Sequence, residues 1–227
     1  MSHDLDTAIV DIDGTLLDSN YHHTLAWVRA FAHVGITVPG WRIHRHLGMG
    51  GDRLVGAVAG DGVEERHGDE VRERWEREYD EIIDETRLLD GARDLLDALG
   101  DAGLTVVLAS SSIPRHAEHA LELLDAGDRA AAWTTAEDAS ATKPDPELLD
   151  AALDRVGGGR AVMLGDSVWD VAAANERGIP TIGLRSGGVG AAELREAGAV
   201  AVYDDPRGLT EHLREALDQA ARAGRSG

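Results

Sequence analysis

Six short apolar segments recur along this chain, and helix-length segments separate them. Strands that are buried on both faces have this composition, whereas a strand with one wet face alternates apolar and polar residues. Strands that alternate with helices form a parallel sheet that is covered by helices on both sides. The chain is therefore predicted to adopt an α/β fold with a parallel sheet, its strands at residues 7–10, 104–108, 131–135, 161–164, 181–184 and 200–202.

The helices between these strands are marked by apolar residues at helical spacing or by a proline in the first turn. Leu95, Leu96 and Leu99 mark the first of them, which a glycine at 100 or 103 can end. The others are expected at 114–124, 146–156, 168–177, 191–197 and 209–221.

A long helical stretch separates the first two strands. No strand is expected between Leu17 and Leu88, and helices are expected at 21–34, 41–47, 52–59 and 63–84. The last of these helices carries an apolar stripe that includes Trp75, and its other side is charged. We therefore expect two domains, an α/β core at 1–16 and 88–227 and an inserted α-helical domain at 17–87.

The first strand ends in two closely spaced carboxylates. Asp11 and Asp13 are two residues apart, so they point to the same side of an extended chain. Gly14 permits a turn that other residues resist, and the Thr15 hydroxyl can bond to that turn. The same residues are also common in turns that have no role in binding or catalysis. However, two neighbouring carboxylates repel each other unless a cation or a shared proton relieves the repulsion. The strand end is therefore a candidate site for a divalent ion and for acid–base chemistry.

Further polar groups follow later strands. Ser110 follows the second strand, Lys143 stands in a loop, and Asp166 and Asp170 follow the strand at 161–164. Ligands of parallel sheets bind beyond the carboxyl ends of the strands, so these groups are expected to meet. Taken alone, Asp166 could instead cap the next helix, and Ser112 could cap the helix that Pro114 begins.

These four segments, in this order and spacing, resemble the motifs of the haloacid dehalogenase superfamily of phosphatases and phosphotransferases. Within it the chain resembles the phosphoglycolate phosphatase and β-phosphoglucomutase-like subfamily, from about Thr7 to about Asp205. The resemblance implies a Rossmann-like core with an inserted helical cap, the domain at 17–87, which closes over the site and selects substrates. It also implies Mg²⁺-dependent hydrolysis of a small-molecule phosphate monoester, phosphoglycolate-like or a sugar phosphate.

The resemblance gives each core residue an expected role. Asp11 would be the nucleophile that forms an aspartyl-phosphate, and Asp13 would act as general acid and then as base. A free aspartate has a pKa of roughly 3.9, so Asp13 is expected to be held partly protonated. Ser110 and backbone N–H groups near Ser111 would bind the phosphoryl group, and Lys143 would offset its charge.

The resemblance assigns the Mg²⁺ site to four aspartates. Asp11 and Asp166 would ligate through their carboxylates and Asp13 through its backbone carbonyl. Asp170 lies one helical turn after Asp166, so both side chains would face the same point. Asp170 would then either bind the ion directly or hold the residues that bind it. Oxygen ligands favour Mg²⁺ over zinc.

Substrate contacts are expected from the core and from the cap. Glycines at 48, 50 and 51 favour Arg53 among the cap candidates, because loops place binding groups. The candidates are Gly14, Thr15 and Ser111 in the core and Arg45, His46, Arg53, His22 and His23 in the cap.

Charge and composition limit the partners. The formal charge is −20, which disfavours nucleic acids and anionic membranes because both are polyanions. Lys143 is the only lysine, and without cysteine there is no disulfide or thiolate chemistry. No segment approaches the roughly 20 apolar residues of a membrane span, and the N-terminal stretch lacks the pattern of a secretory signal. We expect a cytoplasmic protein, monomer or homodimer, whose partner is a small-molecule phosphate ester.

Other activities of the superfamily fit the residues less well. Dehalogenases carry a non-carboxylate at the place of Asp13, and phosphonate cleavage needs a cap lysine that this chain lacks. A β-phosphoglucomutase-like phosphotransferase stays open, although its cap lysine is also absent. More distant alternatives are a phospho-accepting signalling receiver, which lacks the helical insert, and a non-catalytic metal-binding protein.

Overall fold

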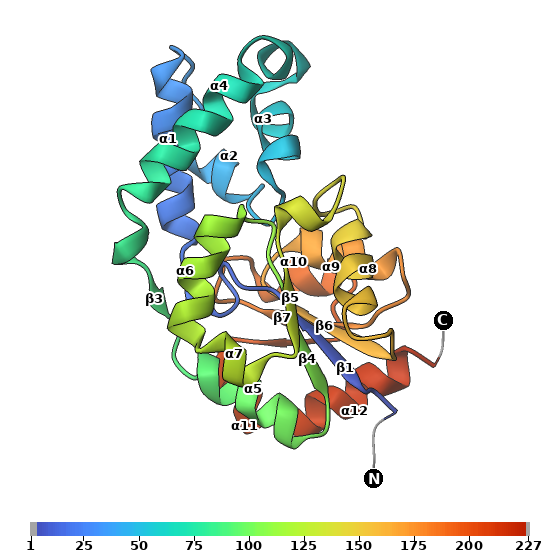
Figure 1. Ribbon diagram of the computed structural model, residues 1–227. Coiled ribbons are helices and arrows are strands. Elements are labelled where there is room, and N and C mark those ends of the chain that lie inside the picture. Colours follow the sequence, from blue (N-terminus) through green and yellow to red (C-terminus); the bar gives the residue numbers. More distant parts are fainter. Residues whose placement is uncertain (1–3, 226–227) are drawn as a thin grey trace.

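The computed structural model, described here for residues 4–225, contains a six-stranded parallel sheet. The strand order is β5-β4-β1-β6-β7-β8, and every neighbouring pair is parallel. The predicted Rossmann-like α/β class is therefore confirmed (Figure 1). Residues 1–3 of the N-terminal stretch lie outside the described part. The strands are β1 (Thr7–Val10), β4 (Thr105–Ala109), β5 (Ala132–Thr134), β6 (Ala161–Gly165), β7 (Thr181–Leu184) and β8 (Ala201–Tyr203).

Both faces of the sheet are covered by helices, because alternate residues of each strand point to opposite sides. Ala8 and Val10 of β1 pack with the helices α5 (Ala92–Asp101), α6 (Pro114–Leu124) and α12 (Leu213–Ala223). Ile9 between them packs with α8 (Glu147–Asp154) and α9 (Val168–Asn175) on the other face. Strand β1 lies between β4 and β6 in the middle of the sheet. The strand that carries the carboxylate pair is therefore the most enclosed part of the core.

The helices of the core follow the predicted order, with two additions. A short α7 was not expected, and the single helix expected at 209–221 is two helices that meet at His212, whose φ is −120°. The core helices are α5 (Ala92–Asp101), α6 (Pro114–Leu124), α7 (Ala126–Arg129), α8 (Glu147–Asp154), α9 (Val168–Asn175), α10 (Ala191–Ala197), α11 (Pro206–Glu211) and α12 (Leu213–Ala223), with a 3₁₀ turn at Ala136–Asp138.

The inserted segment is helical, as predicted, and has a hydrophobic cluster of its own. Trp27 and Phe31 of the first helix pack with Trp75 and Tyr79 of the fourth. The helices are α1 (Asn20–His33), α2 (Gly40–His44), α3 (Gly51–Ala59) and α4 (Asp61–Asp80), followed by a 3₁₀ turn at Ile83–Glu85. Of the helices that the structure describes, none is long and apolar enough to cross a membrane.

The prediction that no strand lies between Leu17 and Leu88 is wrong at both ends of that interval. The short strands β2 (Leu17–Asp18) and β3 (Arg87–Leu88) pair antiparallel, so the two connections between the helical insert and the sheet run side by side. Each strand has two residues, too few for a periodic pattern to show in the sequence.

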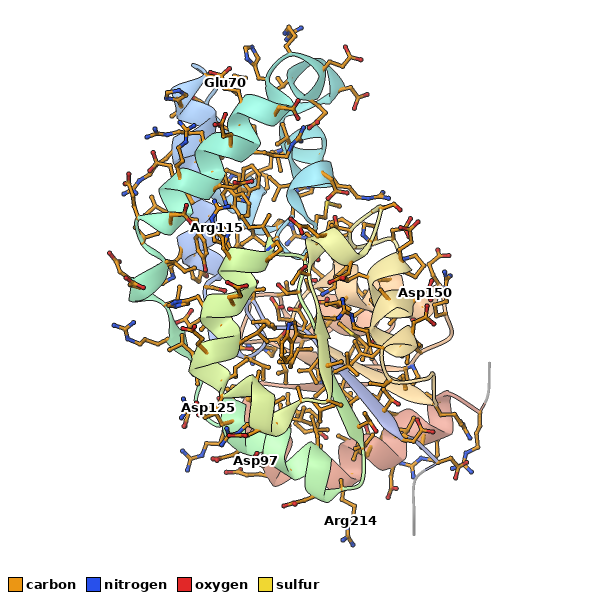
Figure 2. The ribbon with its side chains drawn as sticks, in the orientation of Figure 1. Glu70, Asp97, Arg115, Asp125, Asp150 and Arg214 are labelled. Carbon is orange, nitrogen blue, oxygen red and sulfur yellow. The ribbon has the colours of Figure 1, made fainter. Side chains whose placement is uncertain are left out.

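The insert lies over the carboxyl edge of the sheet and touches the core on several sides. The backbone N–H of Gly50 donates to Thr142 Oγ1 at 2.9 Å, and Ser111 Oγ donates to the Gly48 carbonyl at 3.3 Å. On another side, Arg115 of α6 donates to Asp80 of α4, and Figure 2 shows Arg115 between the two helices. The insert is therefore closed onto the core in this structure.

Candidate active site

Lys143 and Asp11 form the buried centre of the site. Lys143 is 0 % exposed. Its Nζ lies 2.5 Å from Asp11 Oδ1 and 2.7 Å from Asp170 Oδ1. Burial alone would lower the pKa of Lys143, but the two carboxylates raise it above its usual value. The lysine is therefore a fixed positive charge directly beside Asp11.

Asp166 faces Asp11 from the end of β6. Its Oδ1 accepts from Thr15 Oγ1 at 3.1 Å, and its Oδ2 accepts from Asn20 Nδ2 at 2.9 Å. Thr15 also donates to Asp11 Oδ2 at 3.3 Å, so its hydroxyl spans the two carboxylates. Gly14 has a φ of +79°, and a Cβ there would lie 2.5 Å from Asp166 Oδ2. The turn that was predicted from Gly14 and Thr15 thus packs directly against Asp166.

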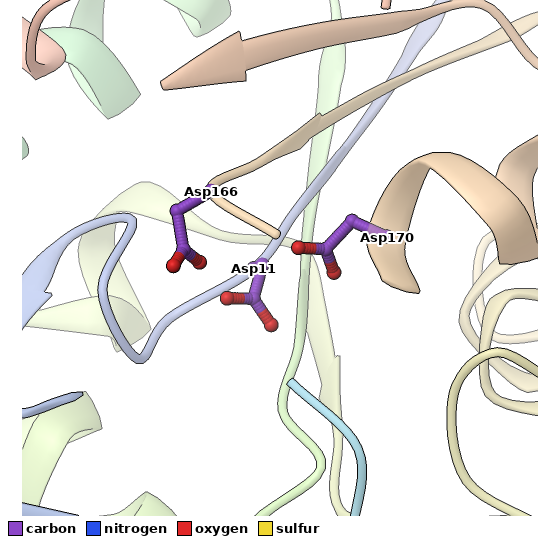
Figure 3. Close-up of side chains that lie close together, drawn as sticks. All are labelled: Asp11, Asp166 and Asp170. Atoms are coloured by element: carbon purple, nitrogen blue, oxygen red, sulfur yellow. The ribbon is translucent and has the colours of Figure 1, made fainter. Parts of the chain in front are cut away.

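Three buried carboxylates converge, as Figure 3 shows for Asp11, Asp166 and Asp170. One carboxylate oxygen of each lies within 4.8 Å of the others. Burial, with the neighbouring carboxylates, raises the pKa of Asp11 to about 7, against the opposing effect of Lys143. Burial, with the charges of Asp170 and Asp11, raises the pKa of Asp166 well above its usual value. One lysine does not balance this cluster, and its oxygen-only donors fit a hard divalent ion such as Mg²⁺.

The helix-capping alternative for Asp166 does not apply. The N-cap of α9 is Ser167, whose hydroxyl accepts from the Asp170 backbone N–H at 3.2 Å. Asp170 Oδ2 in turn accepts from the Ser167 backbone N–H at 3.0 Å and from its hydroxyl at 2.7 Å. This capping box fixes one oxygen of Asp170 and leaves the other toward Lys143 and Asp11.

Asp13 has surroundings different from those expected. Its Oδ1 accepts from Ser19 Oγ at 2.6 Å and lies 3.2 Å from His23 Nε2, while its Oδ2 accepts from Ser112 Oγ at 2.9 Å. Burial raises the pKa of Asp13, but the charge and hydrogen bond of His23 and the two hydroxyls outweigh burial and hold the pKa well below its usual range. The expectation that Asp13 is partly protonated is therefore wrong in this arrangement, because three donors stabilise the carboxylate.

The serine triplet after β4 divides its hydroxyls among three tasks. Ser110 Oγ is buried and accepts from the Ser112 backbone N–H at 3.0 Å. Ser111 lines the pocket beside Asp11 and holds the Gly48 loop. The alternative of Ser112 as a helix cap does not apply, since the N-cap of α6 is Ile113 and the Ser112 hydroxyl binds Asp13.

Of the cap candidates, His23 lines the pocket that contains Asp11, and the other four lie outside it. Arg45 pairs with Glu193 of α10, and Arg53 lies 3.4 Å from Asp145. His46 Nδ1 lies 2.8 Å from the Arg42 carbonyl, and its ring stacks on Trp169 with centroids 5.8 Å apart. His22 does not line the pocket either. In this structure the two arginines bind core carboxylates rather than face Asp11.

The pocket itself lies between the cap and the carboxyl edge of the sheet. It encloses about 450 Å³ of space between atoms, part of it open to solvent. Asp11, Asp13 and two serines line its core side, and aromatic and apolar side chains with the glycine loop line its cap side. The cavity thus opens directly onto the Asp11 carboxylate.

Comparison with known proteins agrees with this geometry. Residues 5–178 match the family model of the haloacid dehalogenase-like hydrolases. The chain belongs to this family. It is 30% identical to a phosphoglycolate phosphatase from Agrobacterium fabrum, across 92% of this chain and 93% of that protein. It is 27% identical to an N-acetylmuramic acid 6-phosphate phosphatase from Pseudomonas aeruginosa, across 94% and 96%.

Solved structures of this family have the same fold. A hydrolase from Pseudomonas syringae superposes with a TM-score of 0.87 at 33% identity, covering 92% of this chain and 98% of that one. A β-phosphoglucomutase from Clostridium difficile superposes with a TM-score of 0.80 at 21% identity, covering 95% and 98%. At that identity the second likeness concerns the fold alone.

Several residues of this dehalogenase-family site were missed or underrated from the sequence. Asn20 and His23 are three residues apart on α1, so one helical face turns both toward the carboxylates. Ser186 Oγ donates to the Gly14 carbonyl at 2.7 Å, and a Cβ at Gly187 would lie 1.6 Å from Asp166 Oδ2. Ser186 and Gly187 follow β7, so the rule of strand ends that identified Ser110 and Asp166 could also have found them.

Proposed function

We propose that this protein is a Mg²⁺-dependent phosphatase that hydrolyses a small-molecule phosphate monoester through a phosphorylated Asp11. The observation that carries the proposal is the position of the Asp11 carboxylate. It lines the pocket between the cap and the core and is held beside Lys143. Phosphoryl transfer needs an in-line nucleophile and neutralised charge, and little other covalent chemistry. The phosphatase relatives named above support the reaction class.

In the first step an oxygen of Asp11 attacks phosphorus, and the bond from phosphorus to the ester oxygen breaks. The leaving alkoxide takes a proton from Asp13, so an alcohol departs and Asp11 carries the phosphoryl group. In the second step water attacks phosphorus and gives a proton to Asp13, which restores the Asp11 carboxylate and releases phosphate. Lys143, with Ser110 at the strand end, would offset charge on the phosphoryl oxygens.

The state of Asp13 sets a condition on this sequence. As the structure stands, Asp13 is a carboxylate, the form that suits the second step. Its role as an acid requires a proton to reach it as the substrate binds. His23 Nε2 lies 3.2 Å from Asp13 Oδ1, so a proton can pass directly between the two groups.

Asp11, Asp166 and Asp170 fit a divalent ion, with the backbone carbonyl of Asp13 as a further donor in the proposal. When bound, Mg²⁺ would neutralise charge that develops on the phosphoryl oxygens. Thr15 and Asn20 hold the Asp166 carboxylate in place for that role.

The cap at 17–87 and the core at 1–16 and 88–227 form the proposed two domains. The separate hydrophobic cluster of the cap supports this division. Closure of the cap would exclude water and place the leaving group. A cytoplasmic location and a monomeric or homodimeric state stay predictions.

A panel of phosphoglycolate, sugar phosphates and other phosphate esters tests the proposal, with and without Mg²⁺. The wild type is expected to release phosphate only with Mg²⁺, and Asp11→Asn is expected to release none. Asp128→Asn, at an exposed position of α7, is the matched control and is expected to behave as wild type. Phosphate on the Asp11 peptide after a rapid acid quench would identify the intermediate. Release that survives in Asp11→Asn would contradict the assignment.

A phosphotransferase is the second candidate, because the Gly48–Gly51 loop is held onto Ser111 and Thr142 of the core, and a closed cap excludes water from the bound substrate. Conversion of one sugar phosphate into its isomer, faster than phosphate release, would favour it. Stoichiometric phosphorylation without turnover would favour a receiver-like protein instead.

A further inference from the structure

The cap side of the pocket offers no arginine or lysine side chain to a leaving group, and its histidine, His23, is held against Asp13. Its lining residues are Asn20, His23, Trp27, Leu47, Met49 and Trp75, together with the Gly48–Gly51 loop. No arginine or lysine is among the described residues that line this pocket. Lys143 serves only the opposite end, since it is fully buried beneath Asp11.

Arg45 and Arg72 line two adjoining pockets and are already paired. Arg45 lines a pocket that shares only Asn20 and Leu47 with this one, and it binds Glu193. Arg72 lines another pocket, donates to the Gly51 carbonyl at 3.1 Å, and pairs with two carboxylates of the cap. Neither arginine is available to the cavity without breaking these contacts.

A negatively charged leaving group would meet carboxylates instead. Asp11 and Asp13 both line the cavity, and the one titratable nitrogen among its lining residues, on His23, is held against Asp13. A carboxylate that enters such a site loses its hydration and gains no partner charge, which is strongly unfavourable. A second anionic group on the substrate is therefore expected to bind poorly in this cavity.

The same wall contains one unpaired donor that a hydroxyl group of the leaving group would satisfy if it reached it. Trp75 is 7 % exposed, and its indole Nε1 is buried without a hydrogen-bond partner among the described residues. A buried donor that is left unpaired costs stability, and a ligand acceptor relieves this. Trp27 stacks on Trp75 with centroids 4.7 Å apart, so the wall is rigid and aromatic with one polar point.

We propose that the preferred substrate is the phosphate ester of a neutral, hydroxylated alcohol, such as a small polyol or sugar. The negative charge of a carboxylate or a second phosphate on the leaving group weakens the binding of such a substrate. This inference rests on the proposed phosphatase function, and it separates the chain from the substrate that its phosphoglycolate phosphatase relative is named for.

Two esters of equal length test the charge rule directly. Phosphoglycolate and 2-hydroxyethyl phosphate differ only in a carboxylate against a hydroxymethyl group. The value of kcat/KM is expected to be at least tenfold higher for 2-hydroxyethyl phosphate, a modest requirement for an unpaired buried charge. Equal values, or a preference for phosphoglycolate, would overturn the inference while leaving the phosphatase function intact. If no ester of the panel is hydrolysed, the proposed function itself fails.

Variants of the lining residues test whether this pocket causes the preference for a neutral leaving group. Met49→Lys places a cation in the lining and is expected to narrow the difference between the two esters, whereas Leu25→Lys, at an exposed position of α1, is the matched control and should leave the difference unchanged. Trp75→Phe removes the unpaired donor and keeps an aromatic ring. It is expected to lower kcat/KM severalfold more for the best polyol or sugar phosphate than for ethyl phosphate. Equal losses for both would refute the hydroxyl contact.

Discussion

Replacing Lys143 by methionine tests whether one buried cation holds the site together. Methionine has a similar length but no charge, so Lys143→Met removes the contacts at 2.5 Å to Asp11 and at 2.7 Å to Asp170. A hydrogen bond to a charged group is worth about 1.5–3 kcal/mol, and breaking a buried pair costs about 3–5 kcal/mol because the partner charge is left uncompensated. We expect a loss of about 3–5 kcal/mol in the free energy of unfolding, a large share of the about 5–15 kcal/mol of a typical protein.

Urea unfolding, followed by circular dichroism without added metal, measures this loss. The matched control is Arg177→Met, which breaks an exposed pair with Asp150 and should shift the midpoint little. The double variant Lys143→Met/Asp170→Asn should recover part of the loss, because one of the uncompensated carboxylates is removed. A loss below about 1 kcal/mol in Lys143→Met, as for an exposed pair, would refute the reasoning.

Three further predictions follow from single contacts. Gly187→Ala should abolish Mg²⁺-dependent turnover with little unfolding, since the new Cβ would lie 1.6 Å from Asp166 Oδ2; normal kcat would show that the loop can move away. Asp13→Asn should lose turnover but keep its fold by circular dichroism, and wild-type turnover would exclude the acid–base role. The pKa of His116 is lowered, first by burial and also by His23 and Arg115, against the effect of Asp80. The unfolded state therefore binds the proton more readily, so the free energy of unfolding should fall as the pH drops below about 6.5. This fall should be smaller in His116→Gln. Equal pH profiles of the two proteins in urea unfolding would contradict the prediction.

The residues at strand ends were predictable because a parallel sheet brings them together whatever the loops do. Asp11, Ser110 and Asp166 each follow an apolar run, and the sheet order places their strands side by side. The helices were predictable from apolar spacing in the same way. The pair β2–β3 was not, because its two-residue strands are stabilised by pairing across the whole insert rather than by their own sequence.

The partners of charged side chains were the least predictable feature. Arg45 and Arg53 have the composition of binding residues, but Glu193 and Asp145, far along the chain, neutralise them. Likewise Asp13 received its low pKa from donors that include Ser112, 99 positions away. Periodicity predicts which face of an element is buried, but it does not say which polar group from another element will meet it.

The placement of cations explains how a chain with a charge of −20 can bind an anionic ester. Many arginines form ion pairs on the surface and between cap and core, such as the pair of Arg115 with Asp80. The only lysine is buried at the phosphoryl end of the pocket, beside the carboxylates that fit a metal ion. Among the described residues that line the pocket there is no arginine or lysine at the leaving-group end. In the function proposed above, the scarcity of cations therefore gives Lys143 its role at the phosphoryl end and makes the leaving-group end selective for neutral molecules.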